Sequence, residues 1–307
     1  MGPKSTELLN VIESRMDSFT KSQRKIAVFI KENLDKAAFY TAASMSNGIG
    51  VSESTIVRFA MELGYEVYPE MQKAIRELIK NKLTAAQRLE VASDRMDEKN
   101  LLRSVLAADS RNIKETLGMI NNEDFDNAVD LILAAKTIYI LGVRSSSALA
   151  GFMGFYFNLI FDNVRLVNTT SASEIFEQMI NVSTEDVVIG ISFPRYSKRT
   201  AKAMQFAKDN GAKVIAITDS YHSPVSRHAD LALLAKSDMT SFVDSLTAPL
   251  SVITALVVAL GMKRKETVHR TLQHLEKIWD EYDVYERIED KHTYAKTKWE
   301  IEEEEDL

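Results

Sequence analysis

Apolar residues recur every three or four positions through the first 80 residues, a spacing that predicts amphipathic helices. One such stripe lies within 6–16 and a second within 22–33. Pro69 is placed at the start of a further helix that runs to about Lys80, because the first turn of a helix does not need the missing N–H group. The N-terminal region is therefore predicted to be an all-α bundle.

The pattern changes from residue 137 onward, where short β-branched and aliphatic runs alternate with helical stretches. Helices are expected near 146–161, 173–181, 197–210 and 220–228, and a long helix at 241–260 is apolar nearly all round, so we expect it to be buried or to form a dimer. Buried runs that alternate with helices predict an α/β fold with a doubly wound, parallel, five-stranded sheet. The five predicted strands are 137–141, 163–167, 186–192, 213–219 and 230–235.

These patterns divide the chain into a helix-turn-helix domain at 1–80, a helical linker at 81–110, an α/β effector-binding and oligomerisation domain at 111–285 and a charged tail at 286–307. A length of 307 residues suits about two domains. The net charge of −6 argues against nucleic acid, but much of the acid lies in the tail, and the first 80 residues are close to neutral. A local surface rather than the total charge decides DNA binding.

Several classes of protein are disfavoured by what the sequence lacks. There is no Cys, which excludes disulfides and thiolate metal sites. The N-terminus has no apolar signal-peptide core, and the longest apolar run, 255–262, is too short to span a bilayer. We therefore expect a cytoplasmic protein that has no membrane partner.

Residues 41–64, TAASMSNGIGVSESTIVRFAMELG, predict a helix-turn-helix. Gly50 marks the tight turn, and Ser52 is a natural N-cap for the second helix. An inward stripe follows the same register, with members Val51, Ile56, Phe59, Ala60 and Leu63. A plain helical hairpin with a glycine turn is the alternative, but the turn, the cap, the stripe and the basic residue Arg58 all fall in register.

The outward, N-terminal part of the second helix is the part that enters the major groove in a helix-turn-helix. We expect Arg58 to contact a base, with Ser54 and Glu53 beside it, because an arginine–guanine pair discriminates bases by about 1–3 kcal/mol. Ser52 and Thr55 are expected to contact phosphate, which positions a protein without reading sequence. For Thr55, half-buried packing is the equal alternative.

Two serine-rich turns follow the first and third predicted strands. Backbone N–H groups at a helix start bind anions. To these N–H groups the first turn adds Arg144 and serine hydroxyls, and the second turn adds Arg195 and serine hydroxyls. Together they predict a pocket for a phosphate that carries hydroxyl groups, although each serine has helix capping as its alternative role. The expected effector-binding residues are Arg144, Ser145, Ser146, Ser192, Arg195 and Ser197.

The string TKSQRKIAVFI followed by GVSESTIVRFAMELGYEVYPEMQKAI, within residues 20–80, resembles the N-terminal domain of RpiR-type bacterial transcriptional regulators. The portion from about 125 to 262 is similar to the SIS (sugar isomerase) domain that completes them. The resemblance implies a regulator of sugar-metabolism genes, a homodimer or homotetramer, that binds double-stranded operator DNA and senses a phosphorylated sugar.

The sequence departs from the usual SIS phosphosugar pattern in both turns. In Gly-x-Gly-x-Ser, which falls on Gly142 and Ser146, the second glycine is Arg144. In Ser-x-Ser-Gly-x-Thr, which falls on Ser192 and Ser197, the central Ser-Gly is Pro194-Arg195. The effector is therefore expected to be a phosphorylated or an acidic sugar. The alternative is a degenerate SIS domain that serves only oligomerisation.

An isomerase is the less favoured alternative, because sugar isomerisation needs a positioned base and fold alone decides nothing. His222 is the one histidine that follows a strand closely, and Glu174 or Glu177 are the candidate carboxylates, but nothing in the sequence pairs them with an acid. Metal-ligand spacing and a Walker-type phosphate loop are both absent from the sequence. We therefore expect no enzyme activity, no catalytic residue, no metal and no cofactor.

Overall fold

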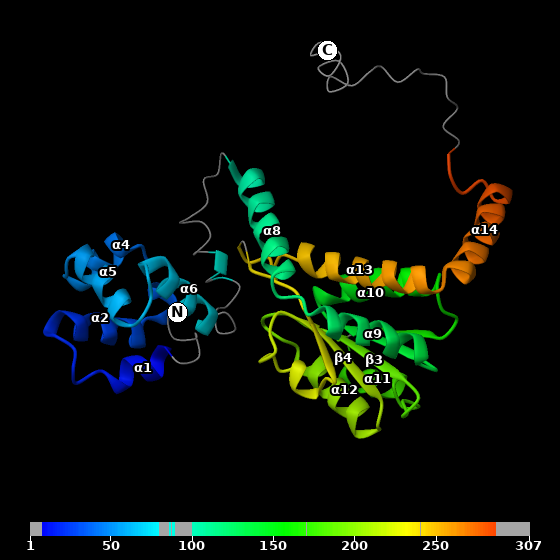
Figure 1. Cartoon of the computed structure of the whole chain (residues 1–307), viewed down its shortest axis with the longest axis horizontal. Coiled ribbons are helices and arrows are strands. Elements are labelled where there is room, and N and C mark those ends of the chain that lie inside the picture. The colour runs from blue at the N-terminus through cyan, green and yellow to red at the C-terminus, as the bar shows by residue number, and fades with distance from the viewer. Residues whose placement is uncertain are drawn as a thin grey trace, which may run out of the picture. The chain divides into compact units, whose positions relative to one another are not determined.

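The computed structural model describes residues 8–79, 86, 88–89, 100–169, 171–239 and 241–286 (Figure 1). By their contacts, the described residues fall into two units that divide between Leu260 and Gly261. The predicted tail lies outside the described residues apart from Glu286, and so does most of the predicted linker before residue 100.

The N-terminal region is all-helical, as predicted. Its hydrophobic core draws on every one of these helices. Pro69 is the second residue of the last of them, and Tyr68, beside it, is buried and donates its hydroxyl to the Tyr40 carbonyl at 2.6 Å. The helices are α1 Leu8–Ser14, α2 Lys21–Glu32, α3 Leu34–Ala37, α4 Ala42–Ile49, α5 Glu53–Glu62 and α6 Tyr68–Ile79.

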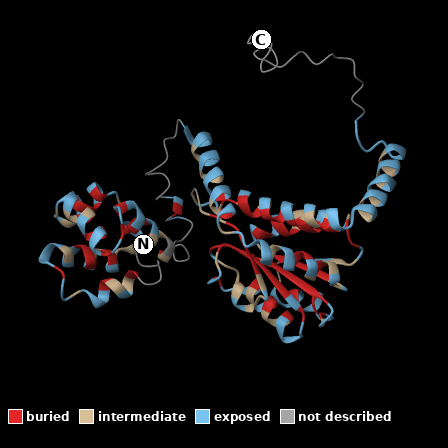
Figure 2. Cartoon of the chain, viewed as in Figure 1, coloured by how far each residue is buried: buried red, intermediate tan, exposed pale blue. Residues whose placement is uncertain are grey.

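The second region contains the five-stranded parallel sheet that the sequence predicts. Its strand order is β2-β1-β3-β4-β5, so the chain winds outward from β1 in both directions. Figure 2 shows most of the strands as the buried centre of this region, whereas the edge strand β2 is largely exposed. The strands are β1 Ile138–Gly142, β2 Val164–Val167, β3 Val187–Ile191, β4 Lys213–Thr218 and β5 Leu231–Leu234.

Helices cover both faces of this sheet, because side chains alternate along each strand (Figure 1). α11 and α12 pack on the face that carries Tyr139, Val188 and Val214. α10 packs on the opposite face, where an added Cβ on Gly142 would meet it. The helices of this region are α8 Leu101–Leu117, α9 Asn122–Ala134, α10 Ser146–Phe157, α11 Ala172–Gln178, α12 Lys198–Asp209, α13 Thr247–Lys263 and α14 Lys265–Glu281.

Two predicted helices differ from the structure. The segment 220–228 holds only a short 3-10 helix, η2 Ser226–His228, because serine hydroxyls there close turns on the backbone: Ser226 donates to the Ser220 carbonyl at 3.0 Å. The apolar helix expected from residue 241 begins at Thr247. Before it, Ser237 donates to the Ser245 carbonyl at 2.8 Å, which holds the connector from β5 in a non-helical conformation.

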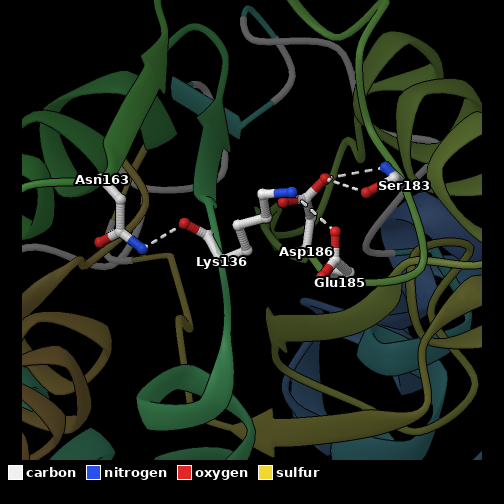
Figure 3. Close-up of polar contacts among 5 residues, drawn as sticks. All are labelled: Lys136, Asn163, Ser183, Glu185 and Asp186. Atoms are coloured by element: carbon white, nitrogen blue, oxygen red, sulfur yellow. Dashed lines mark hydrogen bonds and ion pairs between the residues drawn. The ribbon is translucent and has the colours of Figure 1, made fainter.

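The amino ends of the central strands are closed by contacts within the protein (Figure 3). The Asp186 carboxylate accepts from the N–H and the hydroxyl of Ser183 at 2.8 and 2.9 Å. Asn163 donates to the Lys136 carbonyl, and Lys136 forms an exposed ion pair with Glu185 at 2.7 Å. These contacts link the side chains at this edge to one another, and among their buried atoms only Asp186 Oδ1 makes no hydrogen bond to a described residue.

In the described part of the chain, no single helix is both long and apolar enough to cross a bilayer. α13 and α14 meet the composition test only when they are counted together as a bent pair.

Candidate functional sites

The turn between α4 and α5 has the geometry of the predicted helix-turn-helix. Gly50 ends α4 with φ at 71°, a left-handed conformation that glycine adopts without strain. The Ser52 hydroxyl accepts from the Thr55 N–H at 3.3 Å and caps α5, as predicted. Of the inward stripe, Ile56, Phe59, Ala60 and Leu63 are buried and Val51 is half-buried.

The side chains predicted to contact DNA lie on one exposed end of α5. Ser52, Glu53, Ser54 and Arg58 are exposed, while Thr55 is half-buried and shares its hydroxyl with Ser52 at 2.7 Å. The Arg58 guanidinium lies back along its own helix, where it donates to the Ser54 carbonyl at 3.3 Å and to the Ser54 hydroxyl at 3.4 Å. Arg58 has no acidic partner among the described residues, so its charge is available to a ligand.

The two serine-rich loops leave the sheet side by side. β1 and β3 are adjacent parallel strands, and their last residues, Gly142 and Ile191, are paired in the register. An added Cβ on Gly142 would lie 2.4 Å from the Ser146 carbonyl oxygen, so only glycine lets α10 start this close to the strand.

The first loop carries donors that have no protein partner. Ser145 and Ser146 make no side-chain hydrogen bond within the described residues, and Ser145 does not cap α10 through its hydroxyl. Ser146 is buried and Arg144 is exposed. Ser145 and Ser146 therefore do not cap α10 through their hydroxyls, and the capping alternative does not hold for these two serines. Ser147 donates instead to the Arg144 carbonyl at 2.6 Å.

The second loop is held together internally. Buried Ser192 accepts the Ser197 N–H at 3.1 Å, and the Ser197 hydroxyl caps α12 by accepting from Arg199 and Thr200, each at 3.2 Å. The capping alternative is thus correct for Ser197. A contribution to ligand binding remains a prediction for both serines.

A tyrosine in the second loop connects it to the next strand. Tyr196 donates its hydroxyl to the buried Asp219 carboxylate at 2.6 Å, immediately after β4. This hydrogen bond was not predicted from the sequence. The link fixes the loop to the neighbouring strand.

Arg144 and Arg195 both adopt left-handed backbone conformations, with φ at 57° and 62°. Both stand where the SIS pattern has glycine, a residue that adopts this conformation without strain, and each adds a cation there. A non-glycine residue in this conformation costs roughly 1–2 kcal/mol.

A hollow of about 480 Å³ opens beside the second loop. Arg195, Ser197, Lys198 and Lys202 line it, and no acidic residue does. Lys198 and Lys202 form no ion pair with any described residue. Ser146, Ser192, Arg144 and Ser145 are not in its lining, so the structure brings only part of the predicted set to this hollow.

Of the candidate residues for isomerase chemistry, His222 and Glu174 share no hydrogen bond or ion pair in the described part of the chain. His222 is exposed, and the Glu174 carboxylate accepts a hydrogen bond from Thr169. Across the described part of the chain, no group of three or more His, Asp or Glu side chains is placed to hold a metal ion.

Two family models match the chain in the order of the two regions. The model "Helix-turn-helix domain, rpiR family" covers residues 6–82, and the SIS domain model covers residues 131–259. The chain is 27% identical over 264 residues to the HTH-type transcriptional regulator HexR of Escherichia coli, a match that covers 84% of this chain and 89% of HexR. An uncharacterised HTH-type regulator of Caldanaerobacter subterraneus is 26% identical, with 89% and 97% covered.

Solved structures show the same architecture. The sugar isomerase domain of an RpiR transcription factor from Sphaerobacter thermophilus matches with a TM-score of 0.56 and 25% identity, covering 58% of this chain and 99% of that domain. NanR of Vibrio vulnificus matches with a TM-score of 0.53 and 20% identity, covering 90% and 98%, which shows a shared fold.

A helix-turn-helix domain followed by a parallel SIS sheet defines a DNA-binding transcriptional regulator. The chain belongs to the RpiR family of these regulators, as its sequence predicted.

Proposed function

We propose that this regulator changes its affinity for operator DNA when a phosphorylated sugar binds at the carboxyl edge of the SIS sheet. The observation that carries the proposal is the contrast between the two sheet edges. At the amino edge, Asp186 pairs with Ser183 and Lys136 pairs with Glu185, whereas the carboxyl edge holds serine hydroxyls and lysines that have no partner among the described residues.

The DNA-binding half of the proposal assigns base reading to Arg58, with Glu53 and Ser54 beside it and Ser52 and Thr55 toward phosphate. Loss of a good arginine–base contact costs about 1–3 kcal/mol, or roughly five- to 150-fold in affinity. The Arg58→Ala variant is expected to lose this much affinity for an operator selected from a random duplex pool. Its affinity for unrelated duplexes should change far less, and equal operator protection by variant and parent would refute the assignment.

The effector half of the proposal concerns the class of sugar. The V. vulnificus NanR structure contains ManNAc-6P. In this chain, Arg144 and Arg195 replace glycines of the pattern at a cost in strain, and Lys198 and Lys202 line the same hollow as Arg195. The three cations of the hollow, with Arg144 on the adjacent loop, exceed what one phosphate needs, so the proposed effector carries a phosphate and a second acidic group.

The double variant R144G/R195G tests this choice of sugar. Glycine relieves the left-handed strain, so the variant should melt at the same temperature as the parent or higher. It should bind a sugar-acid phosphate at least tenfold more weakly and a neutral sugar phosphate about as well as the parent. Calorimetry with 6-phosphogluconate and glucose 6-phosphate makes the comparison, and equal losses for both ligands would contradict a second acidic group.

The competing function is a SIS domain that serves only oligomerisation. A thermal-shift screen of sugar phosphates and sugar acids separates the two, because a ligand at 100 times its dissociation constant adds about 2.7 kcal/mol to stability. Failure of every compound to move the melting temperature would favour the oligomerisation role. Turnover of a sugar phosphate by the purified chain would instead favour an isomerase, which the regulator relatives do not suggest.

The proposed regulator acts in the cytoplasm as a homodimer or homotetramer, without catalysis or cofactor. A two-fold assembly would match the half-site spacing of its operator. The domain limits at 80, 110 and 285 are part of the same proposal, and limited proteolysis with mass spectrometry tests them.

A further inference from the structure

A second hollow, of about 570 Å³, lies on the helix-turn-helix domain and was not foreseen from the sequence. α2 forms one wall of it, and Gly48 and Ile49 at the end of α4 line it as well. Its cations are Lys21, Arg24 and Lys25. Glu32 is the one acidic residue in the lining, and it lies seven residues beyond Lys25, roughly 10 Å along the helix axis.

The three cations are exposed and are not neutralised by any residue that the structure describes. None of them forms an ion pair with a described residue; Arg24 donates only to the Asp17 carbonyl, at 3.4 Å. Lys21 and Lys25 are four positions apart on α2, where like charges destabilise a helix by a few tenths of a kcal/mol. Lys31 of the same helix, by contrast, pairs with Glu13 at 2.9 Å.

The hollow lies next to the turn that leads into the DNA-reading helix. Ile49, in its lining, precedes the α5 cap Ser52 by three residues, so their Cα atoms are at most about 11 Å apart. The major groove of B-DNA is about 12 Å wide. With the start of α5 in that groove, the phosphates of one groove wall come within reach of long side chains beside this turn.

We propose that Lys21, Arg24 and Lys25 bind the DNA backbone beside the groove that α5 reads. The chemistry of the surface favours this occupant, because unpaired cations match a row of phosphates and cost stability without one. This surface carries no base-reading role, so it strengthens binding to every sequence alike. The inference rests on the proposed DNA-binding function and adds a contact surface to it.

The salt dependence of DNA binding tests the proposal. Each phosphate contact contributes a slope of about −0.9 to the logarithm of affinity against the logarithm of salt concentration. The full-length K21Q/R24Q/K25Q variant should bind an unrelated 30-base-pair duplex with a slope shallower by about 2 to 3. The single variants K21Q and K25Q should each be shallower by about 1, which covers the case of a triple variant that does not fold.

K36Q is the matched control, since Lys36 is an exposed lysine of α3 outside the hollow. Its slope should equal that of the parent. A parent-like slope in the folded triple variant or in both single variants would overturn the proposal, and would leave an acidic protein segment as the better occupant of the hollow. A parent chain that bound no duplex at all would instead refute the DNA-binding function itself.

Discussion

Substitution of Gly142 is the most severe test of the proposed effector site at the carboxyl edge of the sheet. An added Cβ would lie 2.4 Å from the Ser146 carbonyl oxygen, 2.9 Å from the Ser146 carbonyl carbon and 3.1 Å from the Ala150 Cβ. The first two neighbours are backbone, which cannot rotate away as a side chain can. Relief to an ordinary contact of about 3.4 Å requires the start of α10 to move by about 1 Å, and overpacking of this kind costs about 1–3 kcal/mol.

The Gly142→Ala variant should therefore melt below the parent, by roughly 2–4 °C for each kcal/mol in a domain of this size. A movement of about 1 Å exceeds the roughly 0.5 Å within which a binding site must be held. One charge-assisted hydrogen bond to the ligand, worth about 1.5–3 kcal/mol, should be lost, which weakens sugar-phosphate binding roughly ten- to 150-fold. Binding to an unrelated DNA duplex should not change.

Gly151→Ala on the same helix is the control. An added Cβ at Gly151 meets nothing within 4 Å, and glycine inside a helix costs roughly 0.5–1 kcal/mol relative to alanine. This variant should be slightly more stable than the parent and should respond to effector normally. Thermal melting and calorimetry measure both variants. A Gly142→Ala protein that matched the parent in stability and in effector affinity would refute the reasoning about the close approach of β1 and α10.

Three further predictions concern the polar contacts around the sheet. Asp109 accepts hydrogen bonds from Ser245, in the connector before α13, at 2.6 Å and from Thr247, the first residue of α13, at 3.0 Å. Asp109→Ala should therefore lower stability by about 1.5–3 kcal/mol in urea unfolding, and an unchanged midpoint would contradict this. Tyr196→Phe removes the donor to Asp219 and should cost about 1–3 kcal/mol; no loss would mean that the hydroxyl bond is not formed. Burial alone would raise the pKa of Asp230, but hydrogen bonds from Lys208 and a backbone N–H outweigh burial and lower it, so this carboxylate stabilises the fold above pH about 4 and stops doing so as the pH falls through its lowered pKa. The difference in unfolding free energy between the parent and Asp230→Asn should shrink as the pH falls through the lowered pKa of Asp230. A difference that grew on acidification would contradict the lowered pKa.

Helix α5 and the sheet could be predicted because the interactions that form them join residues close together in the sequence. The Ser52 cap, the left-handed Gly50 and the apolar stripe of α5 each act within a few residues, so the sequence displays them together. The buried runs of β1, β3 and β4 are equally local, because a strand covered on both faces is apolar throughout.

The features that sequence reasoning missed depend on contacts between distant residues. The delayed start of α13 follows from hydroxyls that bond across eight or more residues, as Ser237 does to Ser245. The Tyr196–Asp219 bond joins two loops that only the strand order brings together. In the sequence, nothing distinguishes Lys21, Arg24 and Lys25 from an ordinary solvated helix face. Only the fold places the end of α4 beside them. The one signal of left-handed backbone at Arg144 and Arg195 was that the SIS pattern has glycine at both positions.

The most direct test of the two-part regulator is the affinity for a selected operator duplex, measured by fluorescence anisotropy with and without a saturating sugar-acid phosphate, on the parent chain and on Gly142→Ala. The account predicts that the ligand changes the affinity of the parent severalfold or more. It also predicts that the same ligand concentration has little effect on the variant, although both proteins bind the duplex equally without ligand. An operator affinity that no phosphorylated or acidic sugar altered in the parent chain would contradict the account.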